Sequence, residues 1–178
     1  MKAKQPTAGS AGAVARLGLI LGLLPAVIGG AQSPSPNPAQ KRIPTMQHAT
    51  GTFDVKVTPL PLNGPAEDST LGRMSIEKQF HGDLEATGKG QMLTAGTVAK
   101  GSAGYVAVER VTGTLHGRSG SFALQHSGTM NRGEPHLEVK VVPDSGTGQL
   151  VGLAGTLTII IADGKHSYDF AYTLAESQ

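Results

Sequence analysis

Hydrophobic and polar residues alternate with a period of two along most of the chain beyond residue 46, which is typical of half-buried β-strands. In residues 52–58, for example, apolar side chains stand at positions 53, 55 and 57 and charged ones at 54 and 56. The other such stretches are residues 72–80, 104–115, 120–130 and 136–141, with a Gly-rich stretch at 82–95 that we expect to be one bent strand or two short ones. No segment after residue 46 has the period of a helix.

About eight short strands therefore predict an all-β fold, an antiparallel sandwich or closed barrel. The 25 glycines favour a small barrel, because glycine permits a strand to coil sharply.

The last two strands have the best-determined register. Asp163-Gly164 is a strong signal for a two-residue hairpin turn. This turn brings together facing pairs that are nearly all apolar or aromatic: Ala162 with Lys165, Ile161 with His166, Ile159 with Tyr168, Leu157 with Phe170, and Gly155 with Tyr172. The turn chemistry and the hydrophobic pattern thus predict the same pairing.

The N-terminus has the pattern of a signal peptide. Basic residues at positions 2, 4 and 16 precede an apolar run at 17–28, and small residues follow at 29–31. We expect cleavage near Ala31 and export to the periplasm or beyond. The alternatives are an N-terminal membrane anchor and translation from Met46. Residues 32–45 are Pro-rich and predict an extended, disordered linker, so that the barrel domain covers residues 46–178.

The amino-acid composition excludes several classes of partner and of chemistry. Removal of residues 1–31 takes away three positive charges and no negative ones, so the formal net charge changes from +2 to −1. No basic patch then favours nucleic acid as a partner, and the absence of Trp argues against stacking on bases. The chain has no Cys, which excludes thiol chemistry and a lipid-modified cysteine, so we expect no stable membrane anchor after cleavage.

Several long strings resemble one family of bacterial proteins that is defined only as a domain of unknown function. They are residues 72–85, 101–117, 120–128, 143–150 and 163–170, and the resemblance extends over about residues 46–174. It implies a small antiparallel barrel like that of allene oxide cyclase and dirigent proteins. It implies no activity, because sites are grafted onto folds. Many members begin near Met46, so the export signal is a departure from the family.

Glu109 and His126 are the candidate catalytic residues. If residues 116–119 form a four-residue loop, Leu115 pairs with Gly120 and Glu109 lies directly opposite His126, with Cβ atoms ~5 Å apart. A slip of one residue would separate them. Such a pair could act as general base and acid or orient a ligand. Alternatively, it is a satisfied buried pair that fixes the strand register.

Lys78, Tyr105, His166 and Tyr168 are the candidate ligand-binding residues. Lys78 falls on the apolar face of its strand, where it could neutralise Glu109 or bind a carboxylate ligand; alternatively, it sits at the barrel mouth with its ammonium group in water. His166 and Tyr168 share the apolar face of the last hairpin, and Tyr168 could present its hydroxyl to the lumen or simply fill the core.

His81, Asp83 and Glu85 alternate along an extended segment, a pattern that can bind a metal but is more typical of a solvated strand face. We expect no metal and no cofactor. Residues 117–121 lack the spacing of a serine nucleophile elbow, and neither glycine–lysine dipeptide belongs to a phosphate-binding loop.

Three functions remain open. The first is a binding protein that holds a small, partly apolar ligand in the lumen. The second is an isomerase or cyclase that uses Glu109 and His126 as acid and base. The third is a structural barrel with a filled core, one that could form homo-oligomers.

Overall fold

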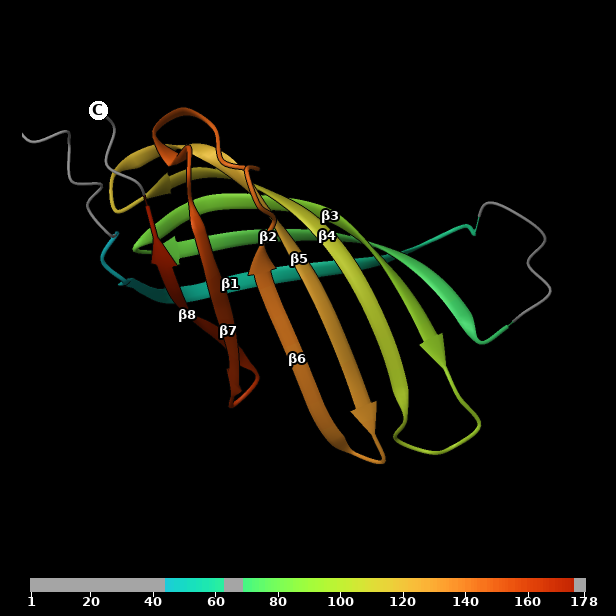
Figure 1. Ribbon diagram of the computed structural model, residues 1–178. Helices are drawn as coiled ribbons and strands as arrows, with labels where there is room; N and C mark the ends of the chain where they lie inside the picture. Colours follow the sequence, from blue (N-terminus) through green and yellow to red (C-terminus); the bar gives the residue numbers. More distant parts are fainter. Residues whose placement is uncertain (1–43, 63–68, 175–178) are drawn as a thin grey trace, which may run out of the picture. The chain divides into compact units, whose positions relative to one another are not determined.

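The computed structural model describes residues 44–62 and 69–174 as a closed eight-stranded antiparallel barrel (Figure 1). The strands are β1 (Gln47–Leu60), β2 (Leu71–Gly82), β3 (Leu84–Gly96), β4 (Ala103–Leu115), β5 (Arg118–Asn131), β6 (Glu134–Val141), β7 (Ala154–Ala162) and β8 (Lys165–Thr173), with a short 3₁₀ helix, η1 (Gly148–Leu150), before β7. Each strand pairs with the next, and β8 pairs with β1. The predicted all-β barrel is confirmed.

The expected leader, residues 1–31, and residues 32–43 of the expected linker lie outside the described residues. The first strand begins at Gln47, next to the expected start of the domain. Among the described residues, none of the helical segments could span a bilayer. The Gly-rich stretch forms the single strand β3, not two short ones.

The predicted register of the last hairpin is confirmed at every pair, from Ala162–Lys165 to Gly155–Tyr172. Both turn residues, Asp163 and Gly164, have positive φ, at 51° and 72°. This is the primed turn geometry that matches the twist of the flanking strands.

The predicted register of the β4–β5 hairpin is wrong by two residues. The turn contains only His116 and Gly117, so Leu115 pairs with Arg118, and Glu109 pairs with Leu124 and not with His126. His116 adopts a φ of 47°, which is unusual for a residue with a side chain. Its backbone N–H donates to Asp83 O at 2.8 Å and its Nδ1 lies 2.7 Å from the Tyr172 hydroxyl, and these contacts hold the conformation.

One end of the barrel is filled with large side chains. Phe122 and Phe170 stack with ring centroids 5.7 Å apart, and Phe170 contacts Tyr172 at 5.3 Å. Leu150 of η1 is buried against this cluster. A filled core requires large side chains that are fully buried, and five such residues lie here: Phe122, Leu124, Leu157, Phe170 and Tyr172. We call this the closed end.

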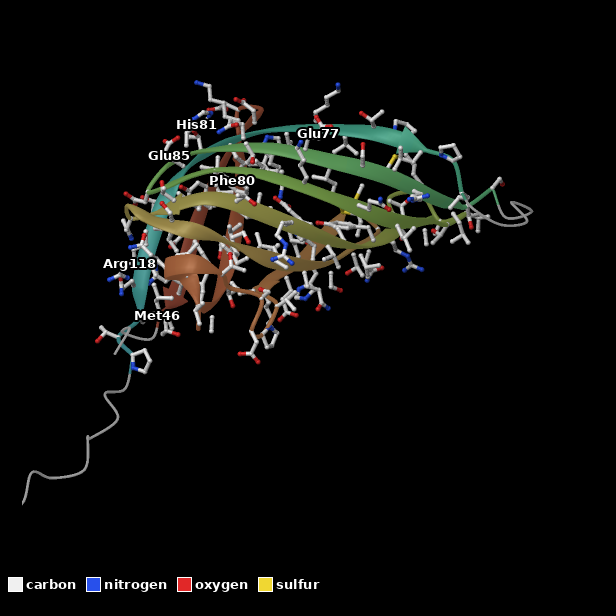
Figure 2. The ribbon with its side chains drawn as sticks, turned by 90° about the horizontal axis from the view of Figure 1, so that it is seen from above. Met46, Glu77, Phe80, His81, Glu85 and Arg118 are labelled. Atoms are coloured by element: carbon white, nitrogen blue, oxygen red, sulfur yellow. The ribbon has the colours of Figure 1, made fainter. Side chains whose placement is uncertain are left out.

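The inner face becomes accessible toward the opposite end of the strands. On β1 the inward-facing series runs from Phe53, 4% exposed, through a partly buried Val55 to Val57, 46% exposed. On β5 it runs from Leu124, fully buried, to Met130, 39% exposed. Figure 2 shows how inward and outward side chains alternate on β2, where Phe80 lies inside while Glu77 and His81 point outward. We call this accessible side the open end.

Tyr168 fastens the β2–β3 turn at the closed end. Its hydroxyl donates to His81 O at 3.1 Å and accepts from the Leu84 N–H at 3.0 Å. A Cβ at Gly51 would lie 2.6 Å from this hydroxyl and 1.9 Å from His81 O, so only glycine leaves room for the arrangement. Both hydrogen-bonding functions of the hydroxyl are therefore used by the backbone.

We predict that Tyr168→Phe lowers the free energy of unfolding by about 1–3 kcal/mol, because the buried Leu84 N–H loses its partner and the partly buried His81 O loses the Tyr168 hydroxyl. Chemical denaturation followed by far-UV circular dichroism measures it. The matched control is Tyr105→Phe, which should change stability little because no hydrogen bond of the Tyr105 hydroxyl is present among the described residues. Equal losses in both variants would contradict a role for Tyr168 as a fastener.

Candidate functional site

A buried ion pair lies in the lumen between β2 and β4. Lys78 Nζ donates to Glu109 Oε2 at 2.7 Å, and the side chains are 5% and 0% exposed. The two residues come from strands that flank β3: Lys78 pairs with Gly88, and Glu109 with Gly90. The alternation of β2 and β4 turns both side chains inward. The prediction that Lys78 neutralises Glu109 is confirmed, and the alternative that its ammonium lies in water is wrong.

His126 completes the cluster from β5. Its Nε2 lies 3.2 Å from Glu109 Oε2, and its side chain is 3% exposed. The two atoms are close but are not aligned for a hydrogen bond, and Nε2 has no hydrogen-bond partner in the described part of the chain. Although His126 pairs with Ala107, a shift of two residues keeps a side chain on the same face, so Glu109 and His126 still meet diagonally.

Two phenylalanines and two glycines shape the space around the ion pair. Lys78 Nζ lies 5.1 Å from the ring centroid of Phe53 and 5.6 Å from that of Phe80. A cation over an aromatic face is stabilised by about 0.5–2 kcal/mol, most where water is excluded. A Cβ at Gly88 would lie 2.1 Å from Glu109 Oε1, and one at Gly90 would lie 2.7 Å from the Glu109 Cα. β3 therefore needs glycine where the Glu109 side chain crosses it.

The charge state of Glu109 results from opposing effects. Burial raises its pKa, but the contact with His126 and the ammonium of Lys78 lower it, and the net effect is a pKa below the ordinary value of 4.5. The carboxylate is thus held ionised in the lumen. Its second oxygen, Oε1, has no hydrogen-bond partner among the described residues.

Tyr105 extends the cluster toward the open end. It lies on the inner face of β4, four residues before Glu109, and its side chain is partly buried. Burial and the nearby Glu109 charge raise the pKa of its hydroxyl. A Cβ at Gly128 would lie 2.2 Å from Tyr105 Cε1, so the ring lies over this glycine, two residues beyond His126. The structure thus brings Lys78, Tyr105, Glu109 and His126 together.

The remaining candidates lie further away. His166 is partly buried and contacts Phe53, with ring centroids 5.1 Å apart, so Phe53 stands between it and Lys78. The Tyr168 hydroxyl is bound to backbone at the closed end.

The prediction that His81, Asp83 and Glu85 share one side of a strand is wrong, because the β2–β3 turn separates them and Gly82 has a φ of 104°. His81 Nδ1 lies 3.8 Å from Glu85 Oε2, while Asp83 accepts from the Thr50 N–H. No group of three metal-ligating side chains gathers within residues 44–62 and 69–174.

Sequence reasoning missed the roles of Phe53, Phe80 and Gly88 around the ammonium and the carboxylate. Glycines alternating along the inner face of β3 were the available signal, since a glycine inside a strand marks the close approach of another group. Chemically, the cluster offers an anionic carboxylate, a cationic ammonium and an imidazole in a surface that is otherwise apolar. It can orient a polar group or transfer a proton.

We predict that Glu109→Gln lowers the free energy of unfolding at pH 7 by about 3 kcal/mol or more, because Lys78 is left as an unpaired buried charge. The lowered pKa means that the ionised carboxylate stabilises the fold above its ordinary pKa of 4.5 and that this contribution is lost as the pH falls through the folded-state value. The difference in free energy of unfolding between the wild type and Glu109→Gln should therefore become smaller as the pH falls below about 4.5. Denaturation curves at several pH values measure it. Glu77→Gln, at an outward-facing position of β2, is the control, and a constant gap would contradict the prediction.

Comparison with known proteins identifies the family to which this barrel belongs. No significant match is found among curated proteins. A solved structure of a protein of unknown function from Shewanella oneidensis MR-1, described as a DUF3224 family member, is 49% identical, with a TM-score of 0.69 over 75% of this chain and 100% of that chain. The model of the family DUF3224, described as a protein of unknown function, matches residues 49–172. This match covers the barrel almost from end to end, and the chain therefore belongs to the DUF3224 family.

Proposed function

We propose that the protein binds a small, partly apolar ligand in the open end of the barrel and that its polar group meets His126 and Tyr105. The observation that carries the proposal is the buried cluster of Lys78, Glu109 and His126, in which two polar atoms have no hydrogen-bond partner among the described residues. We also propose that the protein acts after export, and the N-terminal pattern of residues 1–31 supports this.

The cost of the cluster supports a functional role. Removing two charges from water costs several kcal/mol per ion, and apolar residues of similar volume often replace a buried ion pair with no loss of stability. An unpartnered buried polar atom adds about 1–3 kcal/mol of cost. Polar groups whose burial costs free energy, and some of whose atoms lack a hydrogen-bond partner, are typical of sites where a ligand supplies the missing partner.

The open end supplies an apolar wall for such a ligand. Its accessible inward-facing side chains are mostly aliphatic or thioether groups: Val57, Met74, Met92, Met130 and Leu137. Methionine side chains adapt to irregular shapes, which suits a site for a flexible apolar molecule. Tyr105 stands between this wall and the charged cluster and presents a hydroxyl with no partner among the described residues.

We predict that the folded wild-type protein binds 8-anilinonaphthalene-1-sulfonate, which combines apolar rings with an anionic group, with an increase in fluorescence. Leu137→Glu should weaken binding by about tenfold or more, because it places a negative charge on the apolar wall and repels the sulfonate. His136→Glu is the matched control, since it introduces the same side chain one residue away on the outer face of β6.

Circular dichroism must first show that each variant is folded, because loosened proteins also bind this dye. Failure of the wild-type protein to bind, or equal weakening by both variants, would count against the lumen site. The full chain purified from its host should also be examined by native mass spectrometry for a retained molecule. The intact mass from the same sample shows whether residues 1–31 have been removed.

An enzymatic function is the second candidate, favoured by the 3.2 Å approach of His126 to a carboxylate in the lumen. Glu109 would serve as a base and His126 as the group that returns the proton. A retained molecule that is chemically altered by the wild-type protein and unaltered by Glu109→Gln or His126→Gln would support catalysis. If the molecule is unaltered in all three proteins, ligand binding without catalysis is the function that remains.

We predict that a triple variant, Lys78→Met, Glu109→Leu and His126→Leu, folds with stability equal to or above that of the wild type and loses dye binding. Lys78→Met alone should lose about 3 kcal/mol or more, because it leaves the Glu109 carboxylate without its partner. Thermal and chemical denaturation measure both. If the triple variant is instead much less stable than the wild type, the cluster is structural and the functional proposal loses its main support.

A further inference from the structure

The barrel wall has a weak seam between β6 and β7. Among the described residues, Lys140–Thr156 is the one pair that joins these strands. Every other neighbouring pair of strands shares seven or more residue pairs. Figure 1 shows the two strands diverging. Beyond Thr156, no residue of β7 pairs with β6, although the two strands stay neighbours in the closed barrel. Along the seam, the backbone of residues 157–162 therefore forms a strand edge with ladder partners only on its β8 side.

The two strands along this seam differ in how they are protected against pairing. β6 reads Glu-Pro-His-Leu-Glu-Val-Lys-Val and combines a proline with charged side chains, the means by which natural edge strands avoid association. Its Glu138 and Lys140 form an ion pair of 2.6 Å on the outer surface. β7 reads Ala-Gly-Thr-Leu-Thr-Ile-Ile-Ile-Ala and has no charge and no proline. Ile160 and Ile161 on it are 48% and 66% exposed.

We propose that the edge of β7 pairs with the β7 edge of a second copy of this chain, in antiparallel orientation about a two-fold axis. An unpaired strand edge binds another strand through its backbone, and an uncharged, β-branched sequence favours that strand being an uncharged one. Within the described residues, the strand edge that meets both conditions is β7 itself. The interaction is isologous, so it closes at the dimer.

The side chains of β7 are compatible with this pairing on both faces. In an antiparallel pair of identical strands the two-fold axis passes through one residue that faces its own copy. With Ile159 on the axis, Thr158 faces Ile160 and Leu157 faces Ile161, so no pair contains a charge. The pairing would continue the sheet from one barrel to the next and shield the exposed isoleucines.

A competing surface serves as the control. Outward-facing Leu93, Val106 and Val108 line a groove of about 720 Å³ over β2–β5, and they are between 54% and 58% exposed. These residues belong to strands with partners on both sides, so that association through the groove would be insensitive to the edge of β7.

Sedimentation velocity of the full chain over a range of concentrations tests the proposal. We predict a reversible dimer whose dissociation constant rises by about tenfold or more in Ile160→Lys, because charged edge residues oppose pairing, and stays unchanged in Val108→Lys. Both substitutions place lysine at an exposed outward position, and circular dichroism confirms that both variants are folded. A monomeric wild type overturns the proposal, as does dissociation caused by Val108→Lys and not by Ile160→Lys.

Cross-linking checks the geometry independently. The chain has no cysteine, so single variants Thr158→Cys, Ile159→Cys and Ile160→Cys each carry one thiol. The residue on the two-fold axis has its Cα about 4.5–5.5 Å from that of its copy, within the Cα range of a disulfide, so one of the three should form a covalent dimer on mild oxidation. Val108→Cys should not. Cross-linking of Val108→Cys with none on β7 would assign the interface to the groove and overturn the edge model.

Discussion

The ion pair between Lys78 and Glu109 is the interaction on which the interior of this barrel depends. It places two opposite charges where an apolar layer would otherwise continue, and each neighbouring residue then has a constraint to meet. Gly88 must be small for the carboxylate, and Phe53 and Phe80 must face the ammonium. Because apolar residues of similar volume often replace a buried ion pair with no loss of stability, its presence supports the proposed ligand site in the lumen.

The pair also divides the barrel in two. On one side of it lies the closed end, where Phe122, Phe170 and Tyr172 fill the lumen and Tyr168 ties down a turn. On the other side the inward-facing residues become progressively accessible. The closed end supplies the hydrophobic burial that a chain without disulfides needs. The open end does not have to supply that burial, and the proposed ligand site lies there.

Two-residue periodicity explains why the sequence predicted the cluster although its register was wrong. A strand slip of two residues leaves every side chain on its face, so Glu109 and His126 were predicted to meet and do meet, diagonally instead of directly. The last hairpin was predicted fully because Asp163-Gly164 has the residues that its turn requires. The His116-Gly117 turn could not be recognised locally, because the contacts that hold His116 at positive φ come from Asp83 and Tyr172, far away in the sequence.

The same limit applies to Lys78 and to the edge of β7. A lysine at the end of a sheet and a lysine inside a lumen have the same alternating neighbours in the sequence. Whether the lysine can be buried depends on whether another strand places a carboxylate beside it. That partner, Glu109, arrives from β4, across β3, and only closure of the barrel specifies the distance. The local sequence pattern also does not predict how β7 pairs when the barrel closes. The Thr and Ile residues of β7 predict a strand, but they do not predict that β6 diverges from it after one residue pair. Long-range geometry thus determines both the buried charges that make the lumen unusual and the strand edge that the barrel leaves without a neighbour.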